Sequence, residues 1–290
     1  MTFQIITDSS CSIDKDKVKQ YDIDVISLTY HIDNEDYPCF DENNEPDFRD
    51  FYDRLRQGSM ATTSCPSIYE AQTHLEKYLK EGKDLLYIGF STGLSGTYNA
   101  VCQAADLIKD NYQNRKIICI DTLAASLGQG LLVHYACKLR DEGKSIEEVA
   151  AWLEENKLHL AHWFTVDDLM FLFRGGRVSK TSAWAGMLLS IKPVMHMDND
   201  GHLIPLEKVR GRNKALNALI KHMEQSAIQP ISEQTVFISH GDCIEDANYV
   251  AEEIKNRFGV KDIYINYVDP VIGCHSGPGT LALFFLADQR

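Results

Sequence analysis

The sequence predicts an α/β protein built from two domains. The chain has 290 residues, which is long for a single hydrophobic core. Its first half alternates short apolar strands with helices, a pattern that predicts βαβ units and a parallel sheet. Its second half carries Asp200-Gly201 between two strand-like runs, which predicts a hairpin. We expect residues 1–160 to form an α/β domain with a mostly parallel sheet flanked by helices, and residues 161–290 to form a smaller α/β domain with a mixed sheet.

The elements of the first half follow from the spacing of its apolar residues. A bridging helix at 145–158 is favoured because Ser145 is a good N-cap and acidic Glu147 and Glu148 follow in the first turn. In chain order, we expect strands at 3–7, 25–31, 84–90 and 116–120, and helices at 48–56, 68–79, 96–111 and 131–140.

The second half is read in the same way. The hairpin joins strands at 191–197 and 202–209, and Gly259 ends the last predicted helix. We expect the glycine-rich segment 273–280 to be a loop. The remaining expected strands are 158–166, 235–239, 263–268 and 281–286, and the expected helices are 167–173, 212–225 and 245–258.

Composition and charge exclude several classes of protein. A net charge of −13 argues against binding to nucleic acid or to an anionic membrane through the overall field. No apolar stretch reaches the roughly 18 residues that a membrane-spanning helix needs, and the first residues lack the basic segment of a signal peptide. We therefore expect a cytoplasmic protein.

The cysteines predict neither disulfides nor a metal site. The eight cysteines form no C-x-x-C pair, and no histidine cluster has zinc-like spacing. We expect reduced, mostly buried thiols and no metal or other cofactor. Cys65 and Cys274 lie in hydroxyl- or glycine-rich segments and could contact a ligand, but we assign them no role.

Small polar residues follow three of the predicted strands, at Asp8-Ser9-Ser10, Ser91–Thr97 and Asp121-Thr122. In parallel sheets, ligands bind outside the carboxyl ends of the strands. The sequence therefore predicts a binding site at this edge of the first sheet.

Two hydroxyl-rich segments, 63–67 and 91–97, are each expected as loops at the start of a helix. Helix N-termini offer unpaired N–H groups and partial positive charge, which suit a carboxylate or a phosphate. Neither segment has the lysine of a nucleotide-triphosphate loop, so we expect a small anion. The alternative is that these hydroxyls only cap the helices. The candidate ligand-binding residues here are Thr63, Ser64, Ser95, Gly96 and Thr97.

His275 and Ser276 are further candidate ligand-binding residues, because the surrounding glycines let a ligand approach closely. His275 could donate a hydrogen bond to an anion or move a proton. The alternative is a turn whose histidine is only solvated. His240, at the end of another predicted strand, is a rival whose alternative is a histidine satisfied by backbone groups.

Arginines form the densest basic groups of this acidic chain. Guanidinium groups suit carboxylates and phosphates, so we expect Arg174, Arg177 and Arg210 to dock a partner or to flank an entrance. The alternative is helix C-capping and solvated surface, which fits Lys180 well. The apolar run 183–191 follows and is either core packing or the wall of an apolar tunnel.

Taken in order, these motifs resemble the DegV family of bacterial fatty-acid-binding proteins, the binding subunit of fatty acid kinase. The resemblance implies a two-domain α/β fold with an acyl chain buried between the domains. It places the carboxylate-binding hydroxyls on Thr63 and Ser95, the family's histidine on His275, and its arginine-glycine loop at residues 174–177. It covers the whole chain and depends on the segments 7–10, 63–67, 93–97, 121–130, 174–177, 191–194 and 273–279.

The resemblance implies a long-chain fatty acid as ligand, and a separate ATP-dependent kinase subunit as the partner that converts the presented acid to an acyl phosphate. The protein itself is then a carrier and not an enzyme. Two other classes remain. One is a serine hydrolase of acyl esters with Ser95 as nucleophile and His275 or His240 as base, although Gly93-Leu94-Ser95-Gly96 differs from the G-x-S-x-G elbow. The other is a sugar-phosphate-binding protein.

Overall fold

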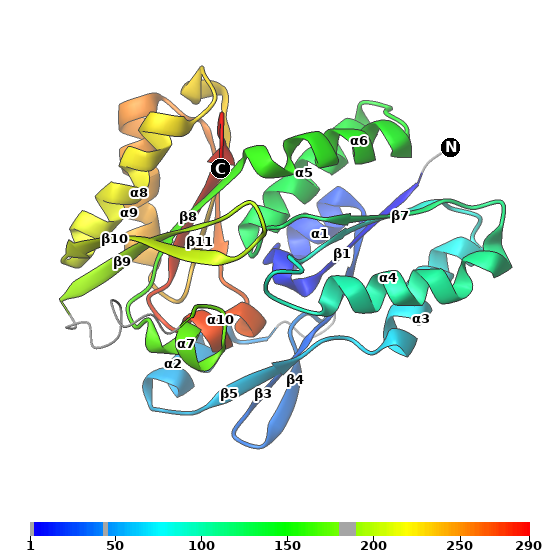
Figure 1. Ribbon diagram of the computed structural model, residues 1–290, viewed down its shortest axis with the longest axis horizontal. Helices are drawn as coiled ribbons and strands as arrows, with labels where there is room; N and C mark the ends of the chain where they lie inside the picture. Colours follow the sequence, from blue (N-terminus) through cyan, green and yellow to red (C-terminus); the bar gives the residue numbers. More distant parts are fainter. Residues whose placement is uncertain (1–2, 43–45, 180–189) are drawn as a thin grey trace.

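The computed structural model describes residues 3–42, 46–179 and 190–290. It confirms the α/β class and contains, within these ranges, three sheets in two halves that lie side by side (Figure 1). Lys180 and residues 183–189 of the apolar run lie outside the described residues. The domain boundary near residue 160 stays a prediction, and strand β8 begins at this position.

Sheet A of the first half has the strand order β2-β1-β6-β7, and every neighbouring pair is parallel, as predicted. Ile5 and Ile6 of β1 pack into different hydrophobic clusters, because helices cover both faces of the sheet. One face packs on α3 and α4, and the other on α1, α5 and α6. The bounds are β1 Gln4–Asp8, β2 Ile23–Ile26, β6 Leu85–Gly89, β7 Ile117–Asp121, α1 Lys15–Tyr21, α3 Ile68–Lys80, α4 Thr97–Ile108, α5 Leu127–Asp141 and α6 Ile146–Asn156.

Sheet C of the second half has the order β10-β9-β8-β13-β11-β12, in which only β11 and β12 pair in parallel. Helices α8 and α9 cover its outer face, and α5 packs on its inner face (Figure 1). A single cluster around α5 therefore joins the two halves. The bounds are β8 Leu160–Thr165, β9 Ile191–Met197, β10 Leu203–Arg210, β11 Thr235–His240, β12 Asp262–Tyr267, β13 Leu281–Leu286, α8 Arg212–Ser226 and α9 Ile244–Phe258.

Sheet B corrects the expectation that Thr63 and Ser64 lie in a loop. Both residues belong to strand β5 (Ala61–Ser64), which pairs antiparallel with β3 (Thr29–Ile32), and β4 (Glu35–Pro38) pairs on the other side of β3. The expected single strand 25–31 is accordingly two strands, β2 and β3. Threonine favours strands, and the partner strand that selects this conformation lies more than thirty positions away in the chain. Helix α2 (Phe48–Arg56) connects β4 to β5.

Helix α10 (Pro270–Ser276) corrects the expectation of a loop at 273–280. Asp269 caps this helix by accepting the backbone N–H of Ile272, and Pro270 occupies its first turn. These are ordinary signals for the start of a helix, but the glycines that follow favour a loop. His275 therefore lies in the last turn of a helix. Helix α7 (Met170–Arg174) packs beside α10 (Figure 1).

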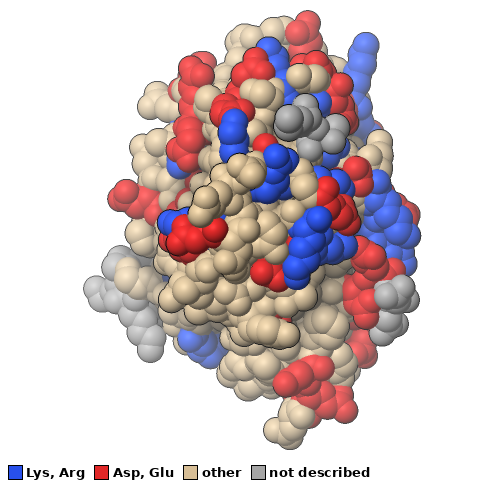
Figure 2. Space-filling model, turned by 90° about the vertical axis from the view of Figure 1, so that its right-hand side faces the viewer, with Lys and Arg blue, Asp and Glu red and all other residues tan. Residues whose placement is uncertain are grey.

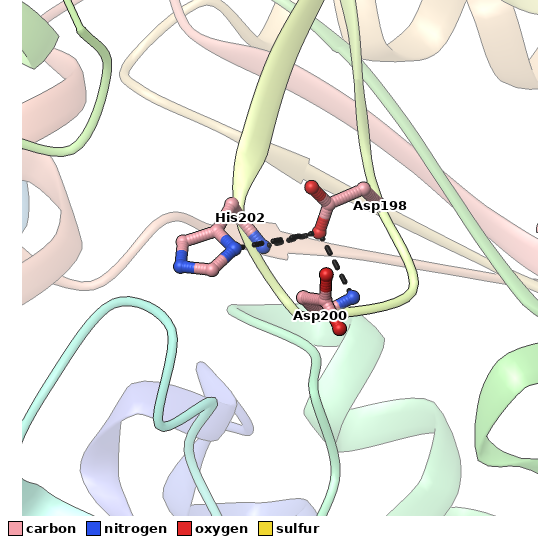
Figure 3. Close-up of side chains that lie close together, drawn as sticks. All are labelled: Asp198, Asp200 and His202. Carbon is pink, nitrogen blue, oxygen red and sulfur yellow. Dashed lines mark hydrogen bonds and ion pairs between the residues drawn. The ribbon is translucent and has the colours of Figure 1, made fainter.

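The β9–β10 hairpin turns where Asp200-Gly201 predicts it. Figure 3 shows Asp198 Oδ1 accepting the backbone N–H groups of Asp200 and His202, at 3.0 and 2.8 Å. The tip of the hairpin reaches the first half, because Ser91 Oγ donates to the carbonyl of Gly201 at 2.9 Å. Sheet C thus contacts the segment that precedes α4.

Candidate ligand-binding site

A cavity lies between the two halves of the molecule. It encloses about 860 Å³ of empty space, counted to include its opening to solvent. Apolar side chains dominate its wall, with Phe90 and Leu94 from the first half and Phe164 and Leu172 from the second. The cavity can therefore accept a largely apolar molecule.

The mouth of the cavity brings Thr63 and His275 into contact, although 212 positions separate them in the chain. Thr63 Oγ1 lies 2.9 Å from His275 Nε2, so β5 and α10 together build this edge of the cavity. Burial lowers the pKa of His275 to about 4, and the nearby Arg177 adds to this effect. His275 is therefore neutral at pH 7 and offers a hydrogen bond rather than a charge.

Ser95 lines the same cavity from the turn that precedes α4. Its Oγ accepts the backbone N–H of Thr97, the first residue of α4, at 3.2 Å and lies 2.9 Å from Thr97 Oγ1, whereas the N-cap position itself is Gly96. Its Oγ also lies 3.5 Å from the thiol of the exposed Cys65. This contact joins the two hydroxyl-rich segments of the sequence.

The structure gathers most of the candidate ligand-binding residues on one wall. Six of them line the cavity, namely Thr63, Ser64, Ser95, Gly96, His275 and Ser276. Thr97 is fully buried and contributes through Ser95 instead. Their role in binding stays a prediction, but their convergence from three separate segments is a structural fact.

Two of the three candidate arginines line hollows of the molecule. Arg177 lines the main cavity, and its Nε donates to the carbonyl of Leu94 at 3.1 Å. Arg174 lines a second, more open hollow outside it, where its guanidinium lies 4.7 Å from the ring centre of Phe171. Both hollows share Thr63, Arg177 and His275. Arg210 ends β10 and lines neither of these hollows, so its predicted role gains no support from its position.

Steric contact explains why a glycine lies between Arg174 and Arg177. A Cβ atom on Gly175 would collide with Nδ1 of His275. The arginine-glycine loop can therefore lie against the His275 ring only because residue 175 has no side chain.

The sequence analysis missed four polar residues that line the cavity. One is Thr280, just before β13, and the other three form the inner wall, namely His162 of β8, Ser239 of β11 and Ser126 at the start of α5. Every second residue of a strand points to the same face, and His162 and Phe164 share the face of β8 that meets the cavity. That alternation could have placed His162, had the inner face of the sheet been known.

A buried hydrogen-bond chain runs from the cavity wall to a carboxyl group. Ser126 Oγ lies 3.0 Å from both Ser239 Oγ and Ser12 Oγ, and Ser12 Oγ lies 2.7 Å from Asp269 Oδ2. Burial raises the pKa of Asp269 to about 6. Because Asp269 also caps α10, the inner wall and the helix that carries His275 share one anchor.

His240 is confirmed as a histidine satisfied within the fold. Its Nδ1 accepts the backbone N–H of Cys243 at 3.3 Å, its ring lies 4.4 Å from that of Tyr267, and burial lowers its pKa to about 4. It does not line the main cavity. Cys274 is buried beside the outer hollow.

The wall of the main cavity carries little permanent charge. Among the described residues that line the main cavity, Arg177 is the only one with a permanent charge. On the face shown in Figure 2, basic and acidic side chains are interspersed rather than gathered by sign. Asp198, Asp200 and His202 are close enough to hold a metal ion, and Asp200 and His202 are exposed. Figure 3 shows that all three belong to the hairpin turn, where Asp198 Oδ1 already accepts two backbone N–H groups. Among the described helices, none is both long and apolar enough to cross a membrane.

The molecule thus combines two α/β halves with an apolar cavity between them whose mouth is rich in hydroxyl groups. The chain belongs to the DegV family, because the family model described as "Uncharacterised protein, DegV family" matches residues 2–288. A DegV domain-containing protein of Clostridium perfringens is 45% identical over 289 residues, which cover 99% of this chain and 98% of the relative.

Solved structures agree with this assignment. A DegV lipid binding protein from Thermotoga maritima superposes with a TM-score of 0.86 at 30% identity, and all of both chains is covered. DegV from Bacillus subtilis, described as a fatty acid binding protein, gives a TM-score of 0.85 at 30% identity and covers 99% of this chain and 100% of its own. The family thus includes proteins that bind fatty acids.

Proposed function

We propose that this protein binds a long-chain fatty acid and presents it to a separate ATP-dependent kinase subunit, without catalysing a reaction itself. The observation that carries the binding proposal is the cavity, whose wall is mostly apolar and whose mouth joins Thr63, Ser95 and His275. The alkyl chain occupies the apolar interior, and the carboxylate lies at the mouth.

Energetics support this division of roles. Each buried CH₂ group contributes about 0.8 kcal/mol, so the chain supplies most of the affinity. Neutral hydroxyl and imidazole donors then orient the carboxylate, with hydrogen bonds of roughly 1.5–3 kcal/mol each for a charged acceptor. A hydrogen bond from the His275 imidazole to one carboxylate oxygen leaves the other oxygen available as the nucleophile for phosphorylation.

The outer hollow supports presentation to a partner. It shares Thr63, Arg177 and His275 with the main cavity, and Arg174 lines it beside the exposed Met60. A carboxylate held by the shared residues therefore lies next to a surface recess with a cationic rim. A kinase subunit with an acidic or phosphate-carrying loop would fit this recess, since arginine suits both groups.

The contacts of Ser95 give no support to an ester hydrolase. Within the described residues, its Oγ contacts Thr97 and Cys65, whereas the imidazole of His275 bonds to Thr63. A nucleophilic serine needs a base within hydrogen-bond reach. The apolar wall likewise disfavours a sugar phosphate, which would leave its hydroxyls unpaired.

The test begins with the protein as purified. Mass spectrometry of a denatured sample should detect a co-purified long-chain acid, and titration calorimetry of the stripped protein should measure rebinding of palmitic acid. Addition of the kinase subunit and ATP should then yield acyl phosphate only when the loaded carrier is present. Failure to bind any long-chain acid would refute the binding proposal, and binding without acyl phosphate formation would refute the presentation step alone.

A further inference from the structure

The inner wall of the cavity carries a histidine that makes no hydrogen bond to any residue that the structure describes. His162 lies in β8, the third of the six strands of sheet C, and only 5% of its surface is exposed. Its ring packs on Phe284 and Phe164, with ring centres 4.6 and 5.5 Å away. Within the described residues, Nδ1 is enclosed without a partner and no hydrogen bond reaches Nε2. A ligand in the cavity therefore meets the ring through Nε2.

This histidine is costly in an apolar wall. Burial lowers its pKa to about 3, with Arg290 and His196 adding to the effect, so the ring is neutral. A neutral imidazole has one N–H donor and one acceptor nitrogen, and leaving them unpaired away from water opposes folding. Leucine or phenylalanine would line an alkyl pocket without that cost.

Ser276 gives a useful contrast. Its Oγ is the other unpartnered polar atom of the described cavity wall, and it is also nearly fully buried. However, Ser276 lies in α10, the helix that also carries His275, so a carboxylate bound near that helix can pair it. His162 lies on the sheet that forms the inner wall, and a carboxylate at the mouth leaves it unpaired.

We propose that His162 selects acyl chains that carry a neutral oxygen substituent, a hydroxyl or a keto group, away from the carboxyl end. The inference depends on the proposed fatty-acid function and narrows its ligand class. A hydrogen bond from the substituent gives Nε2 of His162 a partner, which an unsubstituted alkyl chain cannot do. A charged substituent is disfavoured, because the wall around His162 is apolar and the ring carries no charge.

The first experiment uses the full chain, stripped of lipid, and titration calorimetry. The ligands are stearic acid and monohydroxylated stearic acids with the hydroxyl at successive positions along the chain. At one position we expect binding about 3- to 10-fold tighter than for stearic acid, the gain of one hydrogen bond. If stearic acid binds and no hydroxylated acid binds more tightly, the inference is overturned and the proposed function stands. If no acid binds, both fail.

Variants of His162 test whether this residue causes the preference for hydroxylated acids. His162→Leu should reverse the preference, because the hydroxyl would then be buried without a partner, and His162→Gln should restore part of it. His196→Leu is the matched control, since His196 lies in the neighbouring strand β9 and does not line the cavity. A hydroxyl preference that persists in His162→Leu overturns the inference. If that variant does not fold, the wild-type series and His162→Gln still decide.

Discussion

Replacement of Thr63 by valine tests the head-group site most directly. Valine keeps the branched shape of threonine in β5 and removes only the hydroxyl that lies 2.9 Å from His275 Nε2. In the complex, the same hydroxyl would donate to the fatty-acid carboxylate. We therefore expect a loss of one charge-assisted hydrogen bond, about 1.5–3 kcal/mol, which is about a 10- to 150-fold rise in the Kd for palmitic acid.

The free protein should change much less. Loss of the Thr63–His275 hydrogen bond at a half-buried position should cost about 1 kcal/mol of unfolding free energy. For a chain of this size that is a fall in Tm of about 2 °C. Binding and stability are therefore expected to change by clearly different amounts.

Two controls isolate the carboxylate. Thr62→Val makes the same chemical change one position earlier on the strand, at an exposed residue whose side chain points to the other face, and it should leave the Kd within about twofold. Hexadecanol has the same chain without the carboxylate, and Thr63→Val should barely alter its binding. Calorimetry that gives the same palmitic acid affinity for Thr63→Val and Thr62→Val would refute the head-group assignment.

Three further predictions concern the rest of the site. Ser95→Ala should also weaken palmitic acid binding. The double variant with Thr63→Val should lose less binding free energy than the sum of the two single losses, because both hydroxyls bind one carboxylate. Fully additive losses in calorimetry would argue against a shared ligand. Arg174→Ala should change palmitic acid affinity less than about twofold yet weaken capture of the kinase subunit, so an unchanged pull-down would count against the docking role. Asp269 has a pKa of about 6 against an ordinary 3.8, and the native state therefore holds its proton more tightly than the unfolded chain does. Stability should fall as pH rises from about 4 to about 6, by up to about 3 kcal/mol, and urea unfolding of Asp269→Asn should lack this fall; equal pH slopes would contradict it.

Local sequence signals predicted the elements whose partners are near in the chain. The βαβ alternation gave the parallel sheet A, and Asp200-Gly201 gave the β9–β10 hairpin, because periodicity and turn chemistry act over a few residues. Ser145 likewise marked the start of α6, where it forms a capping box with Glu148.

The predictions that were wrong or missing concern residues whose structure depends on partners far away in the chain. The local sequence predicts that Thr63 lies in a hydroxyl-rich loop, and only its pairing with the distant strand β3 makes it part of a strand. The local sequence predicts a loop around His275, because the glycines near it favour a loop more strongly than the cap at Asp269 favours a helix. His162 carries no local signal of a cavity, since the empty space beside it is formed by segments from both halves. Nearly all the candidate residues nevertheless line the cavity. Hydroxyl groups and glycines suit a ligand whether the backbone that carries them is a loop, a strand or a helix.

Asp269 explains why the mouth and the inner wall of the cavity form one unit. Its carboxyl group is fully buried, which would oppose folding if it were unpaired. Ser12, the thiol of Cys39 and the N–H of Ile272 all donate to it, so it is well satisfied. Ser12 continues to Ser126 on the cavity wall, while Ile272 begins the turn that leads to His275. A change that moved the inner wall would therefore shift His275 through this series of hydrogen bonds. We expect recognition of the acyl chain and orientation of the carboxylate to be coupled in this fold.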